Sequence, residues 1–486
     1  MARSLAHLPA EIIIIIASCL PNSGIKTLRL TCKTLCNTVR LRLDRAFLSA
    51  NPLNITVFRA IADSETFRHG VRDIIWDDAR LVKDLWGEFH IADPREDLWT
   101  DEESGAPLWF VDACKENIKD VQMRKMLHVY CRRTPPEPVL LADQIASDHL
   151  PIRICWQYYQ NLLQQQEDVI VFNRDAEAFT YGLQRFPALT RVTVTAAAHG
   201  WIYAPLALGD EATREDYRGV CIAMHALATY SEHHQVTELR LDAHTLETGL
   251  NCRMFEEPNK QYNDFAAILN KPDFARLDLS LLVRGQERTG WRCFRSGCLR
   301  RALAGAPDIQ HISLTTNVDS SLGSDSSVPG SAGSREQLVP LHTIFPAETW
   351  RSLQHFSLSK FLVEEDDIVS FLSSLPDTLR SVHLGFLYFV NHGGTYGTLL
   401  EDMRDKLDWR SRPSSDLPVV TIALPTEYIQ VGHAIWLDKE VREFLYADGA
   451  NPFWNRGNGM MKAGVVRDAF IPGVHWAPYD VWGGIA

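Results

Sequence analysis

A short hydrophobic pattern, apolar-x-x-apolar-x-apolar, recurs along most of the chain. Between its copies, stretches such as DAEAFTYGLQRFPAL place apolar residues at helical spacing, with Phe179, Leu183 and Phe186 on one face. Alternating strands and helices are typical of α/β proteins with a parallel sheet. The copies of the pattern are Val71-Ile74-Trp76, Leu189-Val192-Val194, Val236-Leu239-Leu241, Phe274-Leu277-Leu279, Ile309-Ile312-Leu314, Leu353-Phe356-Leu358, Leu379-Val382-Leu384 and Val419-Ile422-Leu424.

The spacing of these copies suggests a repeat. From Leu189 onward, successive copies start 26 to 47 residues apart, enough for a strand and a returning helix. The pattern resembles an irregular leucine-rich repeat without the usual asparagine ladder. That resemblance implies a solenoid whose parallel strands line its inner side and whose helices cover the outside. The alternative is an α/β domain whose buried strands follow Pro-x-Leu turns.

The N-terminus carries five consecutive isoleucines, Ile12 to Ile16. Pro9, Glu11 and Pro21 are suited to the start and the end of a helix, so we predict a helix despite the β-branched run. On that helix Ile12, Ile15, Ile16, Cys19 and Leu20 form a complete apolar stripe, and Ile13 and Ile14 project elsewhere. A secretory signal is disfavoured, because Pro9 and Glu11 interrupt its start and the apolar run is far shorter than the roughly 20 residues of a membrane span.

The next segment repeats this excess of apolar positions. One stripe, Ile25, Leu28, Cys32, Leu35 and Val39, leaves Leu30 and Cys36 outside it. Short helices with about 40 residues in total are too small to bury two apolar faces on each helix by packing against one another. The surplus indicates a binding partner.

Leu8-Pro9-x-Glu11-Ile12, Ile15-Ile16, Leu20, Ile25, Leu28 and Cys32-Lys33 resemble an F-box over residues 4–46. The following stretch, from Phe47 to Leu81, looks like what commonly follows the F-box in a large group of fungal proteins. The resemblance implies a three-helix module that docks on the Skp-type adaptor of a cullin-RING ubiquitin ligase. The residues it implies for adaptor contact are Leu8, Pro9, Glu11, Ile12, Ile16, Leu20, Leu28, Cys32 and Lys33.

Two alternatives stay open for this module. If Ile12 and Ile16 belong to the module's own core, Ile13 and Ile14 take the contact role. The second alternative is that the segment is an ordinary helical hairpin that packs against the rest of its own protein.

Composition narrows the classes of partner. The 486 residues include 49 Lys plus Arg and 61 Asp plus Glu, so the net charge is −12 and no overall positive field attracts nucleic acid. The ten cysteines lack the C-x-x-C spacing of zinc or redox sites, which favours reduced thiols in a cytoplasmic or nuclear protein. We expect neither a nucleic-acid partner nor a membrane partner.

Four regions follow from these patterns. We predict an F-box at residues 1–46, a largely helical linker region with the first repeat strand at 47–188, a repeat region for substrate binding at 189–435, and a cap rich in tryptophan at 436–486. Residues 318–337 are rich in Ser and Gly, which predicts a disordered loop inside the repeats.

No motif in the chain indicates catalysis, and we expect no cofactor, no metal site and no catalytic residue.

The expected function is substrate recognition in an SCF-type ubiquitin ligase, with the polar strand positions holding an unknown target protein. A scaffold without ligase activity and an unrecognised hydrolase or transferase are the alternatives. The polar positions proposed for the target are Arg191, Thr193, Glu238, Arg240, Arg276, Asp278, His311, Ser313, His355, Ser357, Ser381 and His383. In this arrangement His311, His355 and His383 share one face of the sheet. Either their placement at polar strand positions is due to chance, or two or three of the imidazoles share a metal or an acidic ligand.

Overall fold

The structure is a computed structural model of the whole chain. It describes residues 5, 8–81, 100–130, 150–196, 218–242, 249–283, 285–318, 337–390, 393–426, 433–454, 463–468 and 475–476. The predicted loop at 318–337 therefore lies almost entirely outside the described residues. The same holds for much of the predicted cap, including Trp482.

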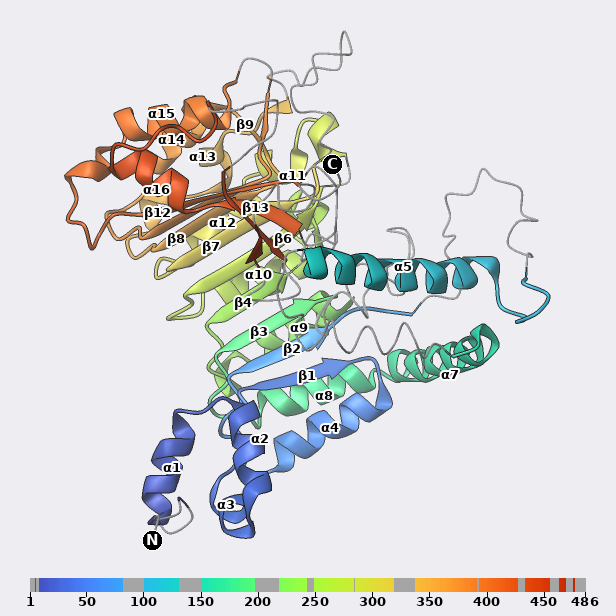
Figure 1. Cartoon of the computed structure of the whole chain (residues 1–486). Helices are drawn as coiled ribbons and strands as arrows, with labels where there is room; N and C mark the ends of the chain where they lie inside the picture. The colour runs from blue at the N-terminus through green and yellow to red at the C-terminus, as the bar shows by residue number, and fades with distance from the viewer. Residues whose placement is uncertain are drawn as a thin grey trace.

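One large, mostly parallel sheet organises the chain, which confirms the predicted α/β class (Figure 1). Its strands follow the order of the sequence, each beside the next, because a helix or loop returns the chain to the same end of the sheet after each strand. The parallel strands are β1 (Arg45–Ser49), β2 (Asp73–Asp77), β3 (Arg191–Thr195), β4 (Glu238–Asp242), β6 (Arg276–Leu282), β7 (His311–Thr316), β8 (His355–Ser359), β10 (Ser381–Gly385) and β12 (Val419–Leu424).

Each of the eight predicted strand patterns contributes to one of these strands. Their apolar residues stand in register across the sheet, so that Val192 lies opposite Leu239 and Ile312 opposite Phe356. One residue was placed on the wrong face. Val419 is in register with Ser381 on the polar face and is 45% exposed, and Val420 is the buried residue at this point.

The first strand was not predicted. β1 pairs in parallel with β2, and Ala46 and Leu48 stand opposite Ile74 and Trp76. Its sequence fits the same pattern as Leu43-x-x-Ala46-x-Leu48, although the small alanine weakens the signal. The predicted boundary at residue 46 therefore falls inside a strand of the sheet.

The far end of the sheet changes direction. β13 (His433–Leu437), β14 (Val465–Asp468) and β15 (His475–Trp476) pair antiparallel, and the predicted boundary at Trp436 falls inside β13. A short strand, β5 (Leu250–Asn251), pairs with β6 outside the main order. A separate pair joins β9 (Leu362–Val363) to β11 (Tyr388–Phe389).

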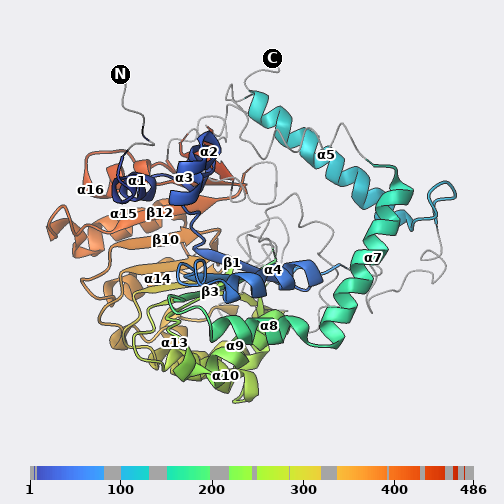
Figure 2. The same cartoon turned by 90° about the horizontal axis from the view of Figure 1, so that it is seen from below.

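Helices cover one face of the sheet (Figure 2). A continuous core from Ala46 to Phe453 joins the apolar strand side chains to these helices. The packing is close where α8 crosses α4, because a Cβ at Gly182 would lie 2.5 Å from Cζ of Phe58. These helices are α4 (Pro52–Asp63), α8 (Arg174–Leu183), α9 (Arg218–Thr229), α10 (Lys260–Leu269), α11 (Arg292–Arg295), α12 (Cys298–Ala304), α13 (Leu341–Ile344), α14 (Glu365–Ser373), α15 (Tyr396–Lys406) and α16 (Lys439–Tyr446).

Two long helices project away from this layer, α5 (Leu108–Tyr130) and α7 (Ile152–Val171) (Figure 2). They share a small aromatic core of their own, in which the rings of Phe110 and Trp156 lie 4.9 Å apart. The helical content predicted between Trp76 and Leu189 is present in these helices and in α8.

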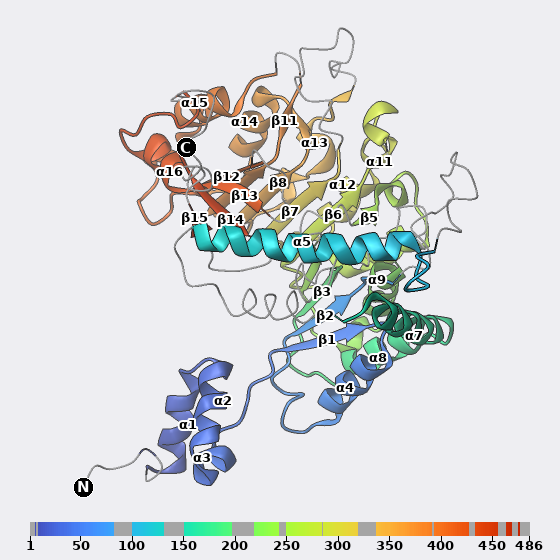
Figure 3. The ribbon, with the colours of Figure 1, turned by 45° about the vertical axis from the view of Figure 1, so that its right-hand side comes forward.

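The N-terminal helices α1 (Ala10–Ser18), α2 (Asn22–Thr31) and α3 (Lys33–Thr38) stand apart from the sheet (Figure 3). We call residues 8–39 the helical module. Arg42 joins the module to the sheet: its Nη1 donates to the carbonyl oxygen of Ser18 at 2.7 Å, and its backbone nitrogen donates to Oδ1 of Asn22 at 3.1 Å. Two residues later, the carbonyl oxygen of Asp44 accepts from the backbone nitrogen of Arg72 at 2.9 Å.

Candidate functional site: an apolar helix face and a polar sheet face

The helical module has a small core that uses only part of its apolar residues. Ile13, Ala17, Ile25, Leu35 and Val39 fill this core, and each is at most 5% exposed. Of the isoleucine run, Ile13 alone is fully buried. The prediction that Ile13 and Ile14 take over the contact role therefore does not hold for Ile13, which serves the core.

The opposite side of α1 carries an uncovered apolar face, formed by Leu8, Ile12, Ile15, Ile16 and Cys19. Leu8, Ile12 and Ile15 are 37%, 43% and 60% exposed, and Ile16 is half-buried. Ile12, Ile15, Ile16 and Cys19 recur at i, i+3, i+4 and i+7, so they share one side of the helix, and Leu8 lies just before its first turn. We call this set the α1 face. Ile14 is also exposed, but with about 100° per residue it points about 160° away from Ile12 around the helix.

The predicted adaptor residues divide into two groups. Leu8 and Ile12 lie on the α1 face with Ile16, and Pro9, Glu11, Cys32 and Lys33 are exposed beside or beyond it. Leu20 and Leu28 instead pack against the module core. Sequence reasoning omitted Ile15, although its helical spacing placed it on the same stripe, and it omitted Leu30, which is 87% exposed.

The second feature is the polar face of the sheet, opposite the core. The predicted target residues lie there in two rows of the register. Arg191, Glu238, Arg276, His311, His355 and Ser381 form one row, and Thr193, Arg240, Asp278, Ser313, Ser357 and His383 form the other. The structure thus brings all of these residues onto one face of the sheet, as the pattern predicted, but Thr193 and Ser357 are buried there, at 5% and 3% exposure, and do not face solvent.

In strands β2 to β7 this surface consists of ion pairs, which we call the charged ladder: Asp73, Arg191, Glu238, Arg240, Arg276, Asp278 and His311. Nε of Arg191 donates to Oε2 of Glu238 at 2.7 Å, and Nε of Arg240 donates to Oδ2 of Asp278 at 2.6 Å. Nη2 of Arg276 and Nε2 of His311 also reach Asp278, at 2.8 and 2.7 Å.

Electrostatics explain the state of Asp278. Burial raises the pKa of this carboxyl, but the hydrogen bond from His311 and the charges of Arg276 and Arg240 outweigh burial and bring the pKa below its ordinary value. Asp278 therefore remains a carboxylate at neutral pH, and it holds three donors in place.

At β8 and β10 the positions of the same surface are occupied by histidine and serine. The rings of His311 and His355 stack with centroids 4.0 Å apart, and Nδ1 of His355 lies 2.6 Å from Oγ of Ser381. His383 stacks on Trp436 at 5.0 Å. Burial lowers the pKa of His355 to about 3, helped by His311 and His383, and burial lowers the pKa of His383 to about 4. His355 and His383 are therefore neutral at pH 7.

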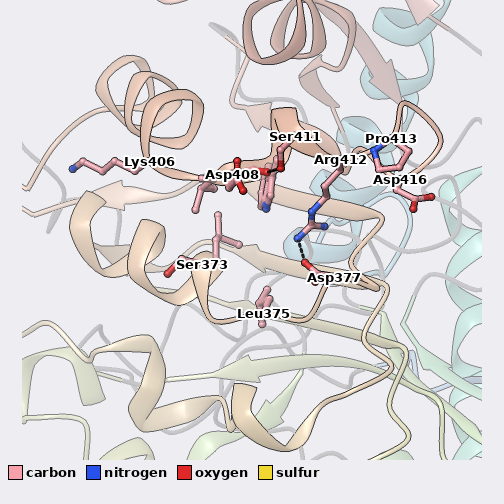
Figure 4. A pocket seen from close by; sticks show the side chains of 12 residues that line it. Ser373, Leu375, Asp377, Lys406, Asp408, Ser411, Arg412, Pro413 and Asp416 are labelled. Carbon is pink, nitrogen blue, oxygen red and sulfur yellow. Dashed lines mark hydrogen bonds and ion pairs between the residues drawn. The ribbon is translucent and has the colours of Figure 1, made fainter.

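A groove of about 540 Å³ lies on the helix side, between the end of α14 and the turn after α15 (Figure 4). Nη2 of Arg412 donates to Oδ1 of Asp377 at 2.8 Å across it. The described residues that line this groove include serines, carboxylates, Lys406 and Arg412, but no histidine or cysteine that would activate a nucleophile.

Within the described part of the chain, no three His, Cys, Asp or Glu side chains gather closely enough to hold a metal ion. Among its helices, none is both long enough and apolar enough to cross a bilayer.

Comparison with models of known protein families finds no match for this chain, and comparison with characterised proteins finds none either. The fold defines an α/β protein with an open, mostly parallel sheet. Any function must be argued from the two surfaces themselves.

Proposed function

We propose that this protein is the substrate-recognition subunit of an SCF-type cullin-RING ubiquitin ligase. The α1 face binds the Skp-type adaptor, and the polar face of the sheet holds a target protein. On this proposal the protein catalyses nothing itself. It holds the target beside the ubiquitin-transfer machinery and so raises the effective concentration of the target's lysines there.

The observation that carries the proposal is the uncovered α1 face. A nine-residue helix with one apolar side buried and another exposed is unusual for a protein surface, and it fits a surface that a partner covers. Burial of each large aliphatic side chain contributes on the order of 1.5 to 3 kcal/mol, so three or four of them suffice for a stable complex. The resemblance of the same residues to an F-box supports the adaptor as that partner.

The sheet supports the second half of the proposal. Its sequential strands, each followed by a return to the same end, fit an irregular leucine-rich-repeat-like solenoid, in which the strand surface binds other proteins. An SCF subunit of this kind works in the cytoplasm, the nucleus or both. We therefore assign the protein to these compartments as part of the proposal.

The alternative is a scaffold that binds the same adaptor without ubiquitin transfer. Reconstitution separates the two: purified protein is mixed with Skp-type adaptor, cullin and RING subunits, and the mixture is run on a sizing column and assayed for ubiquitin transfer. Co-elution of all components with ubiquitin transfer to the subunit itself or to a bound protein is expected. Binding of the adaptor without recruitment of cullin would favour the scaffold, and no adaptor binding by folded protein would refute both.

A further inference from the structure

The charged ladder has a layered arrangement of charge. Three arginines, Arg191, Arg240 and Arg276, lie on the neighbouring strands β3, β4 and β6, and three carboxylates, Asp73, Glu238 and Asp278, balance them. The formal charges of these six side chains sum to zero. Their depths, however, differ.

The carboxylates lie deeper than the arginines. The side chains of Asp73, Asp278 and Glu238 are 9%, 14% and 24% exposed. Those of Arg276, Arg191 and Arg240 are 28%, 32% and 32% exposed. Negative charge therefore forms the floor of this surface, and positive charge forms the layer that a ligand meets first.

The carboxylates also orient the guanidinium groups. Arg240 uses its Nε for Asp278, so the paired Nη groups are not engaged by that carboxylate. Arg191 donates its Nε to Glu238 in the same way, and its Nη1 lies 3.8 Å from Oδ2 of Asp73. A guanidinium fixed along one edge presents its other N–H groups without further loss of side-chain freedom, which favours hydrogen bonds to a second carboxylate or to a phosphate.

We propose that strands β3 to β6 of the polar face bind an acidic segment of the target, one that carries carboxylate or phosphate side chains. The inference rests on the proposed function for the nature of the ligand, a segment of a target protein. The contacts belong to the charged ladder and not to the neutral imidazoles from β8 onward. Because the whole protein carries a net charge of −12, attraction to an anion is local to this surface.

The probes are a fluorescent hexaglutamate peptide, a phosphoserine peptide of the same length and a Gly-Ser peptide, titrated by fluorescence anisotropy in about 50 mM salt, where charge screening is weak. Both acidic peptides are expected to bind and the Gly-Ser peptide is not. The relative affinity of the two acidic peptides distinguishes carboxylate from phosphate as the preferred ligand group.

Two substitutions test the site. Arg191→Gln combined with Arg240→Gln is expected to weaken hexaglutamate binding at least about tenfold, because the loss of one charged hydrogen bond lowers the affinity by about that factor. Glu238→Gln removes the floor charge but keeps an amide oxygen that can accept from Nε of Arg191, so it is expected to strengthen binding several-fold. The matched control is Arg300→Gln: Arg300 on α12 is 34% exposed and paired with Glu348 at 2.6 Å, but it belongs to the helical layer.

Circular dichroism checks that each variant is folded. Equal binding by the folded double variant, an equal loss in Arg300→Gln, or no binding by the wild type would overturn the inference. If the double variant does not fold, Glu238→Gln decides, and unchanged or weaker binding overturns the inference. The assay contains no adaptor, so its failure is separate from a failure of the α1 face to bind one.

Discussion

The sheet region and the helical module treat their apolar residues in opposite ways. In the sheet region the apolar strand residues face one side, and the helices cover them almost completely, as with Leu239 and Leu277 at 0% exposure. In the module, Ile13 is buried and its neighbours Ile12, Ile14 and Ile15 are more than 40% exposed. A large region can complete its own core, and a three-helix unit with two apolar faces on one helix cannot. The comparison shows that the sheet region covers its own apolar residues and the module does not, which supports the proposal that a partner covers the α1 face.

The largest effect is expected from a cavity in the sheet core. Phe356 is 1% exposed and its ring lies 4.9 Å from that of Phe371. Phe356→Ala should lower the free energy of unfolding by about 4 kcal/mol, because the side chain leaves a cavity among rigid neighbours. Urea denaturation followed by tryptophan fluorescence measures this loss. Val419→Ala, at an exposed position of the same sheet, should change stability by less than about 0.5 kcal/mol, and a similar loss in both variants would contradict the assigned register.

A cavity in the module core should act locally. Ile13→Ala is expected to destabilise the module by about 3 kcal/mol, because Ile13 fills its small core. Hydrogen exchange should then speed up in α1 to α3, while protection of the sheet amides stays unchanged. Ile12→Ala should leave exchange in the module nearly unchanged. Loss of protection across both regions in Ile13→Ala would show that the module and the sheet unfold as one unit.

Acid should weaken the sheet more than the module, through His355 and His383. Their pKa values in the folded protein are about 3 and 4, below the ordinary 6.5, so folding favours the neutral rings. This stability is fully present above pH 6.5 and is lost as pH falls toward the folded values. Between pH 7 and pH 5, each of the two rings should lower the free energy of unfolding by up to about 2 kcal/mol. Urea titrations at a series of pH values measure the slope, and His355→Gln should remove its share. An unchanged slope in that variant would refute the assignment to His355.

The smallest effect is expected at the connection between the two regions. Arg42→Ala removes the hydrogen bonds to the end of α1 and should cost about 1 kcal/mol of module stability. Hydrogen exchange at Cys19 and Leu20 reports the loss. Arg40→Ala, which removes only an exposed 3.3 Å contact with Thr66, is the control and should have less effect.

Local periodicity was enough to predict the strands and their shared polar face, because the apolar pattern repeats with the spacing of a pleated strand. It missed β1, where Ala46 takes the place of a large apolar residue. It also placed Val419 on the core face, since two overlapping frames of the pattern fit that segment. The antiparallel pairing of β13 with β14 joins segments such as those around Trp436 and Val465, which no local pattern connects.

The two surfaces differed in how far sequence could describe them. Helical spacing showed that α1 has two apolar sides, but only packing against Ile25, Leu35 and Val39 determines which side is buried. The residues of the charged ladder were predicted as a set, except for Asp73, whose register with Arg191 places it on the same face. The layering of the ladder, with Asp278 beneath Arg240 and Arg276, depends on side-chain depth, which no one-dimensional pattern encodes.

Calorimetric titration of Skp-type adaptor into the full-length protein tests the central claim most directly. The variants are Ile12→Glu combined with Ile15→Glu on the α1 face, and Ile14→Glu as the control on an exposed position of the same helix outside that face. The account predicts tight one-to-one binding by the wild type and by Ile14→Glu, and at least about a hundredfold loss in the double variant, from burial of two charges in an apolar contact. Equal binding by all three proteins, or none by folded wild type, would contradict the assignment of the α1 face to the adaptor.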